Sequence, residues 1–161
     1  MGETTLEITL TVNGKLLTKS VNVRQHLADF LRIELGLTGS QLGCEHGICG
    51  ACSVRVNGSV VRGCLILAVQ ADGANVVTIE GLTETGEIAD LQKNFIDRNA
   101  LQCGFCTPGM LMTVADLLRN TVSSNRRNIR EYLSGNLCRC TGYHAIVDAV
   151  ETTIKARLGD S

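Results

Sequence analysis

Hydrophobic and polar residues alternate along the first part of the chain, which is the pattern of half-buried β-strands. Four aliphatic residues between positions 6 and 12 alternate with Glu and Thr, and Asn13-Gly14 follows them. An Asn-Gly pair between two alternating runs is typical of a tight hairpin turn. The pattern therefore predicts one strand over 6–12 and a second, returning strand over 16–21.

Three more strands are predicted, over 53–56, 59–61 and 75–79. The first two flank a second Asn-Gly pair, Asn57-Gly58, and so predict another hairpin. Between the hairpins, apolar residues recur three and four positions apart, which predicts a short helix over 24–35. Several strands with one helix indicate a compact α+β unit.

The hydrophobic period changes to that of a helix after about Gly81. Four helices are predicted, over 88–96, 107–118, 128–133 and 143–158. Because the links between them are short, we expect these helices to pack as a four-helix bundle. The sequence thus predicts an α+β protein with two domains, residues 1–80 and residues 81–161.

Composition and charge narrow the class of protein. The 161 residues are 44% hydrophobic and 19% charged, with a formal net charge of −1, which is typical of a globular protein. We see no basic face for nucleic acid or an anionic membrane, and we interpret the basic pair Arg126-Arg127 as part of a solvated loop. No apolar stretch approaches the ~18 residues of a membrane span, and the acidic, alternating start is unlike a signal peptide. We therefore expect a cytoplasmic protein.

Eight cysteines in a cytoplasmic protein indicate metal or redox chemistry rather than disulfides. The first set of four is Cys44, Cys49, Cys52 and Cys64. Its C-x4-C-x2-C spacing with a distant fourth cysteine is that of plant-type [2Fe–2S] sites. Each iron of such a cluster completes a tetrahedron with two thiolates, so a loop has to wrap around the cluster. We interpret these thiols as cluster ligands; zinc suits the spacing less well.

Glycines separate the cysteines of the segment GCEHGICGAC. We expect Gly43, Gly47 and Gly50 to adopt positive φ and to let the backbone approach the inorganic sulfides without a Cβ clash. Backbone N–H groups could then donate hydrogen bonds to the sulfurs. Such bonds stabilise the reduced state of a cluster and raise its potential.

The second set of cysteines is Cys103, Cys106, Cys138 and Cys140, arranged as C-G-F-C and C-R-C between predicted helices. The helix that begins at Thr107-Pro108 would direct the positive end of its dipole toward these thiols. The spacing suits a second cluster but also a tetrahedral zinc ion, and the residues alone leave both open. Arg139, between two of the cysteines, either offsets cluster charge or points away as a surface arginine.

The two cysteine sets together resemble one known family. GCEHGICGAC with RGCL, LQCGFCTPGM and GNLCRCTGY are similar to the small iron–sulfur subunit of the molybdenum hydroxylases. This is the family of xanthine dehydrogenase, aldehyde oxidoreductase and aerobic carbon monoxide dehydrogenase. The resemblance covers nearly the whole chain, with no departure at a ligand position. It implies an N-terminal ferredoxin-like β-grasp domain, a C-terminal four-helix bundle and one [2Fe–2S] cluster in each.

The resemblance also implies partners and an order of electron flow. A large subunit would oxidise the substrate at a molybdenum–molybdopterin centre. Electrons would then pass through the helical-domain cluster and the ferredoxin-like cluster to FAD in a medium subunit, in a heterotrimer or a dimer of heterotrimers. The family positions beside the pterin correspond to Gln102 and Cys140. Without the resemblance, Gln102 would be an ordinary polar residue at a helix end.

We find no site for substrate chemistry in the remaining sequence, which has no nucleophile elbow, P-loop or dinucleotide-binding glycine motif. We interpret His46 as a loop residue, His144 as structural or interfacial, and His26 as solvent-facing. The predicted function is therefore that of an electron-transfer subunit of an oxidoreductase. The alternatives are a free two-cluster ferredoxin and a zinc-stabilised interaction module without redox activity.

Overall fold

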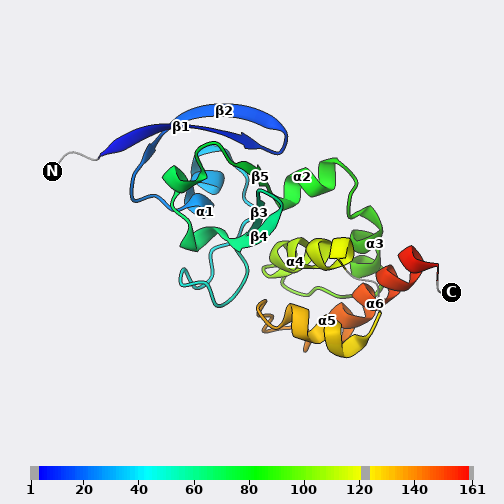
Figure 1. Ribbon diagram of the computed structural model, residues 1–161. Helices are drawn as coiled ribbons and strands as arrows, with labels where there is room; N and C mark the ends of the chain where they lie inside the picture. Colours follow the sequence, from blue (N-terminus) through cyan, green and yellow to red (C-terminus); the bar gives the residue numbers. More distant parts are fainter. Residues whose placement is uncertain (1–3, 121–123, 160–161) are drawn as a thin grey trace.

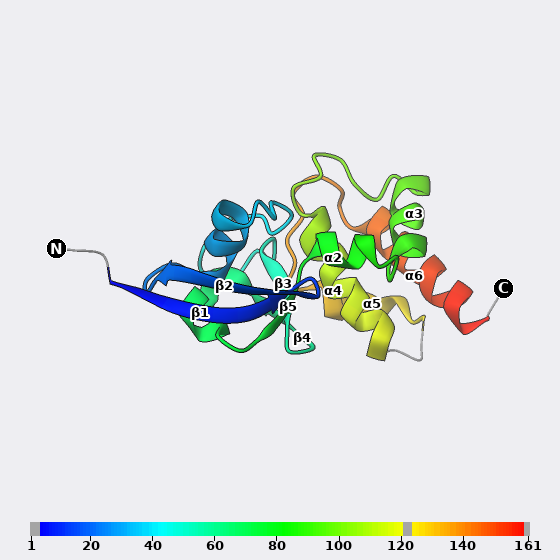
Figure 2. The ribbon, with the colours of Figure 1, turned by 90° about the horizontal axis from the view of Figure 1, so that it is seen from above.

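The computed structural model describes residues 4–120 and 124–159, and its two parts lie along one long axis (Figure 1). A small β unit forms one end and a group of helices forms the other, and the view from above shows the same division (Figure 2). The elements are β1 (Thr5–Val12), β2 (Lys15–Asn22), α1 (Leu27–Asp29), β3 (Ser53–Val56), β4 (Ser59–Arg62), β5 (Asn75–Val77), α2 (Ile79–Glu84), α3 (Ala89–Asp97), α4 (Thr107–Asn120), α5 (Arg126–Leu133) and α6 (His144–Leu158).

The five strands form one mixed sheet in the order β2-β1-β5-β3-β4. β1 and β2 pair antiparallel over their whole length, and β5 is parallel to β1 but antiparallel to β3. Asn13 and Gly14 both have positive φ, as the tight turn between β1 and β2 requires. Together with the helices that follow, this arrangement confirms the predicted α+β class, with a ferredoxin-like unit ahead of a helical one.

The helix predicted over 24–35 is shorter and less regular than expected. α1 has three residues and continues as a π-helical turn over Phe30–Glu34. His26 caps its start, since the His26 Nδ1 accepts a hydrogen bond from the Asp29 backbone N–H at 3.1 Å. The His26 Nε2 also lies 3.1 Å from the Asp29 carboxylate. The expectation that His26 faces solvent is therefore wrong.

The inward-facing side chains of the sheet pack against α1 and the turn that follows it. The main members of this core are Ile8, Leu10, Val12, Val21, Leu27, Phe30, Leu31, Val54 and Val76. Burial of these apolar side chains is the chief source of stability of the β unit. Leu6 continues the alternation of β1 but is 53% exposed, so the buried part of that strand begins at Ile8.

The four predicted helices are present as α3, α4, α5 and α6, each with ends within two residues of the prediction. An additional helix, α2, follows the sheet directly, because β5 ends two residues earlier than predicted. The Asn13 side chain fixes this turn: its Oδ1 accepts from the Thr78 N–H at 2.9 Å, and its Nδ2 donates to the Thr78 hydroxyl at 3.0 Å. The hairpin of the β unit thereby holds the start of the helical part.

An ion-pair group joins α5 to α6. Arg126 Nη1 lies 2.7 Å from the Asp148 carboxylate and 2.5 Å from that of Glu151. Arg127 pairs with Glu131 one turn further along the same helix, at 2.9 Å. The prediction of a loop for this basic pair is therefore wrong, since both arginines belong to the first turn of α5. Arg127 is solvated as predicted, with its side chain 85% exposed.

The two parts of the molecule are in direct contact. α4 packs against β3 and β4, and Val60, Val77 and Ile79 pack against the core of the helices. Arg55 on β3 makes a two-point ion pair with Glu87, at 2.8 and 3.2 Å. The division at residues 80 and 81 stays a prediction. Over 4–120 and 124–159, no helix is long and apolar enough to cross a membrane.

Candidate iron–sulfur sites

All eight cysteines are free thiols, and they lie in loops and turns next to the ends of helices and strands. Three cysteines of the first set lie in the segment between α1 and β3, and the fourth, Cys64, lies just after β4. The second set lies immediately before α4 and between α5 and α6. Each predicted set is therefore brought together from segments that are distant in the sequence.

The first four thiols form two pairs. The Cys49 backbone N–H donates to the Cys44 Sγ at 3.3 Å, which joins one partly exposed pair. Cys52 and Cys64 form a buried pair whose thiols interact directly. Cys52 also interacts electrostatically with Cys49, so the two pairs adjoin.

The second four thiols repeat this arrangement. The Sγ atoms of Cys103 and Cys140 lie 3.6 Å apart, and both residues are exposed. Cys106 and Cys138 form a more buried pair whose thiols interact with each other. Electrostatic interactions of Cys106 with Cys103 and of Cys138 with Cys140 connect the outer pair to the inner one.

The thiols of each set are arranged two by two. A zinc ion needs its four ligands around a single point. A [2Fe–2S] cluster has two irons that each take two thiolates, so it needs two adjoining pairs. Both sets of thiols fit the two-iron group.

The glycines of the first loop act partly as predicted. Gly47 and Gly50 have positive φ, +85° and +72°. Gly43 does not, so the expectation for this residue is wrong. Glycine is favoured at position 43 for a steric reason, because a Cβ there would lie 3.2 Å from the Cys49 Sγ and 3.3 Å from the Phe105 ring. The backbone therefore passes close to a thiol of one set and a side chain from the loop of the other.

Residues beside the second set hold its loop in place. The Thr141 hydroxyl donates to the Cys138 Sγ at 3.1 Å. The Tyr143 hydroxyl accepts from the Cys138 backbone N–H at 2.8 Å and donates to the Asn136 carbonyl at 3.1 Å. Tyr143 itself has a left-handed backbone, with φ of 67°. A strained residue that is held by several bonds is typical of a functional loop. No local pattern in the sequence assigns this role to Thr141 or Tyr143.

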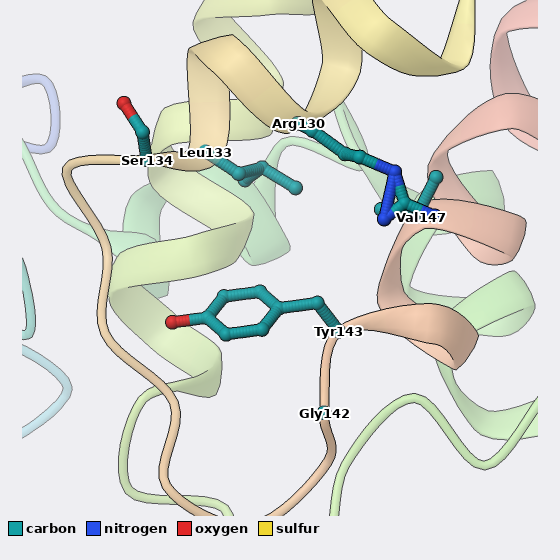
Figure 3. A pocket seen from close by; sticks show the side chains of 6 residues that line it. All are labelled: Arg130, Leu133, Ser134, Gly142, Tyr143 and Val147. Atoms are coloured by element: carbon teal, nitrogen blue, oxygen red, sulfur yellow. The ribbon is translucent and has the colours of Figure 1, made fainter.

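Figure 3 shows the Tyr143 side chain projecting from the start of α6 below Leu133, while the Arg130 side chain extends from α5 toward Val147. A cavity of about 290 Å³ lies here, and Ser134 and Gly142 complete its lining. None of its lining residues is a cysteine, so this cavity is separate from the thiol pairs.

Local environment makes the thiols unequal. A hydrogen bond from the Cys49 backbone, supported by one from His46, lowers the pKa of Cys44 to about 6. Burial raises the pKa of Cys52 to about 11 and that of Cys106 to about 12. Burial also acts on Cys138, but hydrogen bonds from Thr141 outweigh it and lower its pKa. The thiolate is the form that binds metal, so the hydrogen bonds at Cys44 and Cys138 favour the ligand form of these two thiols.

A backbone hydrogen bond joins the two cysteine loops next to their ligand candidates. The Leu137 backbone N–H donates to the Cys49 carbonyl oxygen at 2.8 Å, and Leu137 directly precedes Cys138. Cys49 of the first set is thus joined to Cys138 of the second set through this hydrogen bond and the backbone of Leu137.

The other predicted residues lie at the surface. Gln102 is exposed and directly precedes Cys103 in the outermost thiol pair. Arg139 is also exposed, between Cys138 and Cys140. His46 is an exposed loop residue whose ring contacts the Cys44 carbonyl, and His144 is the first residue of α6.

Comparison with known proteins agrees with this geometry. Residues 10–75 match the family model of the 2Fe-2S iron-sulfur cluster binding domain, and residues 78–151 match that of the [2Fe-2S] binding domain. Caffeine dehydrogenase subunit gamma from Pseudomonas sp. (strain CBB1) is 50% identical over 148 residues, which are 90% of this chain and 89% of the relative.

Solved structures are also similar. Quinoline 2-oxidoreductase from Pseudomonas putida 86 matches with a TM-score of 0.88 and 46% identity, over 98% of this chain and 99% of the matched chain. Aldehyde oxidoreductase from Desulfovibrio gigas matches with a TM-score of 0.86 and 40% identity, over 97% of this chain but 18% of the matched chain. The same fold thus occurs both as a separate subunit and as part of a longer polypeptide.

Two adjoining domains, each of a [2Fe–2S]-binding type, define a protein that carries two such clusters. The chain belongs to the small iron–sulfur subunits of the molybdenum hydroxylase family and is part of an oxidoreductase. The family that the resemblance implied is therefore confirmed. The alternative of a zinc-stabilised module is excluded, because both domains are of a [2Fe–2S]-binding class.

Proposed function

We propose that this chain is the electron-transfer subunit of a heteromeric molybdenum hydroxylase. In this proposal it relays electrons from a molybdopterin centre in a large subunit to FAD in a medium subunit. A bound [2Fe–2S] cluster takes up and releases one electron at a time, so two clusters divide a two-electron oxidation into single steps. The observation that carries the proposal is the short connection between the two thiol sets through Leu137 and Cys49.

We assign the ligands from the thiol pairs. Cys44 with Cys49, and Cys52 with Cys64, would hold the first cluster. Cys103 with Cys140, and Cys106 with Cys138, would hold the second. Residues 1–80 and 81–161 then each form one domain around one cluster.

Exposure of the thiols supports the direction of the relay. The Cys103–Cys140 pair is at the surface, where a cofactor of another subunit can approach it, and Gln102 lies beside it. The inner pair of the same set adjoins Leu137 and through it Cys49. We therefore place the molybdopterin beside Gln102 and Cys140, and the flavin near the partly exposed pair of the first set.

Exposed apolar side chains around the first cysteine loop support a partner rather than a freely diffusing carrier. Ile48, Leu65, Phe105 and Leu137 are 59%, 61%, 45% and 51% exposed. Each lies in or against the loop of residues 43–49, since Phe105 adjoins Gly43, Leu65 adjoins Gly47 and Leu137 bonds to Cys49. Apolar side chains gathered at one place mark an interaction surface. We also propose a cytoplasmic location, because cysteines that bind clusters rather than form disulfides suit a reducing compartment.

The proposal is tested by purifying the native assembly under anaerobic conditions and identifying its subunits and cofactors. It requires a large chain with molybdopterin and a medium chain with FAD to copurify with this one. In that assembly, Gln102→Ala is expected to slow reduction of the second cluster by substrate, with both cluster signals unchanged. A stable, monodisperse chain that carries both clusters and binds no other subunit would contradict the proposal and support the free ferredoxin.

A further inference from the structure

One asparagine is buried where the two cysteine loops meet. Asn136 is 2% exposed and lies two residues before Cys138. Its Nδ2 donates to the Gly50 carbonyl at 3.1 Å, in the turn between Cys49 and Cys52. Its Oδ1 accepts from the Thr113 hydroxyl on α4 at 3.0 Å. Both ends of the amide are satisfied, which orients the Asn136 side chain and makes the loss of a partner costly.

An arginine of the first part reaches the same loop. Arg62, at the end of β4, donates from Nη2 to the Gly135 carbonyl at 2.6 Å, and its Nη1 contacts the Ser53 hydroxyl. The Ser53 hydroxyl in turn donates to the Gly50 carbonyl at 2.6 Å. Arg62 directly precedes the turn that contains Cys64, so this bond ties a second ligand segment to the loop before Cys138.

The contact between the two cysteine loops is too close to accommodate a Cβ atom at either of two glycines. A Cβ on Gly50 would lie 2.6 Å from the Gly135 carbonyl oxygen and 2.7 Å from the Asn136 Nδ2. A Cβ on Gly109, in α4, would lie 2.3 Å from the Gly50 carbonyl oxygen. Three backbone segments therefore meet as closely as glycine allows, and polar bonds fix their positions from both sides.

We infer that Asn136 and Arg62 are positioning residues that set the separation and the electronic coupling of the two clusters. This inference rests on the proposed two-cluster relay. The Asn136 side chain binds the Gly50 carbonyl, which lies between Cys49 and Cys52. The Arg62 side chain, just before the turn that contains Cys64, binds the Gly135 carbonyl in the loop before Cys138. One electron that leaves the second cluster is gained by the first, so the rate of this step depends on the distance that these bonds fix.

The test uses the full chain with both clusters bound and reduced. Asn136→Ser removes the bridge to Gly50, and Arg62→Gln removes the charge-assisted bond to Gly135. The matched control is Asn94→Ala, because Asn94 also bridges two elements, donating to the Thr153 hydroxyl on α6 at 2.9 Å. The readouts are the splitting that the two reduced clusters impose on each other's EPR signals, and the rate of electron transfer between them after rapid reduction.

In Asn136→Ser and Arg62→Gln, each cluster is expected to keep its own signal and midpoint potential. The mutual splitting is expected to shift or vanish, and the transfer rate to fall. Asn94→Ala is expected to match the wild type in both readouts. Wild-type splitting and rate in both bridge variants would overturn the inference, as would two clusters in the wild type without any splitting. If Asn136→Ser does not retain both clusters, Arg62→Gln decides. A wild type that lacks two clusters would instead refute the proposed function.

Discussion

The backbone N–H of Leu137 donates to the carbonyl oxygen of Cys49 at 2.8 Å, across the junction between the β unit and the helices. Leu137→Pro removes this donor and is expected to cost about 1 kcal/mol of unfolding free energy and to slow transfer between the clusters. Leu137→Ala keeps the donor and trims a side chain that is 51% exposed, so it is the control. Rapid-reduction kinetics on both variants measure the effect, and equal rates with both clusters bound would contradict it.

Because the two clusters have separate ligands, each cysteine substitution is expected to remove the EPR signal of one cluster only. Cys103→Ser is expected to remove the EPR signal of the helical cluster and to leave that of the ferredoxin-like cluster. Cys52→Ser is expected to do the reverse, since its thiol pairs with Cys64 in the other set. EPR spectra of the reduced variants give the answer. If either substitution removed both signals from a folded protein, the division of the eight thiols would be incorrect.

The hydroxyl of Thr141 is expected to tune the helical cluster, because it donates to the Cys138 Sγ at 3.1 Å. A hydrogen bond to a ligand sulfur stabilises the more negative, reduced state. Thr141→Val should therefore lower the equilibrium constant for one-electron reduction of the helical cluster about tenfold. This corresponds to a midpoint potential that is about 59 mV lower. Thr141→Ser keeps the hydroxyl and should stay near the wild-type potential. A redox titration followed by EPR distinguishes them, and an unchanged potential in Thr141→Val would rule this role out.

The Arg55–Glu87 pair is expected to stabilise the junction in a pH-dependent way. A hydrogen bond from Arg55 holds the pKa of the Glu87 carboxyl below its ordinary value of 4.5. Because the folded-state pKa is the lower one, the stabilisation is complete above about pH 4.5 and is lost as the pH falls through the folded-state value. The Glu87 side chain is 36% exposed, so solvent screening limits the effect to about 1 kcal/mol or less.

The variant that tests this pair is Glu87→Gln. It should unfold faster than the wild type in urea at pH 7, and the two rates should converge as the pH falls below 4.5. Stopped-flow unfolding immediately after a pH jump measures both before the clusters are lost. Lys93→Gln is the control, because Lys93 and Asp97 form an exposed pair within one helix, away from the junction. A difference in rate that persists at low pH would show that the ion pair is not its cause.

The sequence predicted those features that depend on local patterns. Asn-Gly pairs between alternating runs predicted both hairpins, and the helical period predicted α3 to α6 closely. The C-x4-C-x2-C, C-x2-C and C-x-C spacings are also local patterns, and they marked the loops that carry the ligand candidates. These signals are contained in short stretches of the chain, so no tertiary contact was needed to interpret them.

Features that depend on long-range contacts were not predictable in this way. α2 begins because Asn13 binds Thr78, sixty-five residues away in the chain. Arg126 resembled a loop residue until α6 supplied its carboxylate partners. The burial of Asn136 between the two loops likewise arises only when the β unit and the helices meet.

The central claim is that eight thiols in two quartets hold two [2Fe–2S] clusters. Its most direct test is an iron and sulfide analysis of anaerobically purified chain together with a reductive titration followed by EPR. The account predicts about four irons and four sulfides per chain, and two distinct signals that appear as two electrons are taken up. About two irons with a single signal, or zinc in place of iron in either quartet, would contradict it.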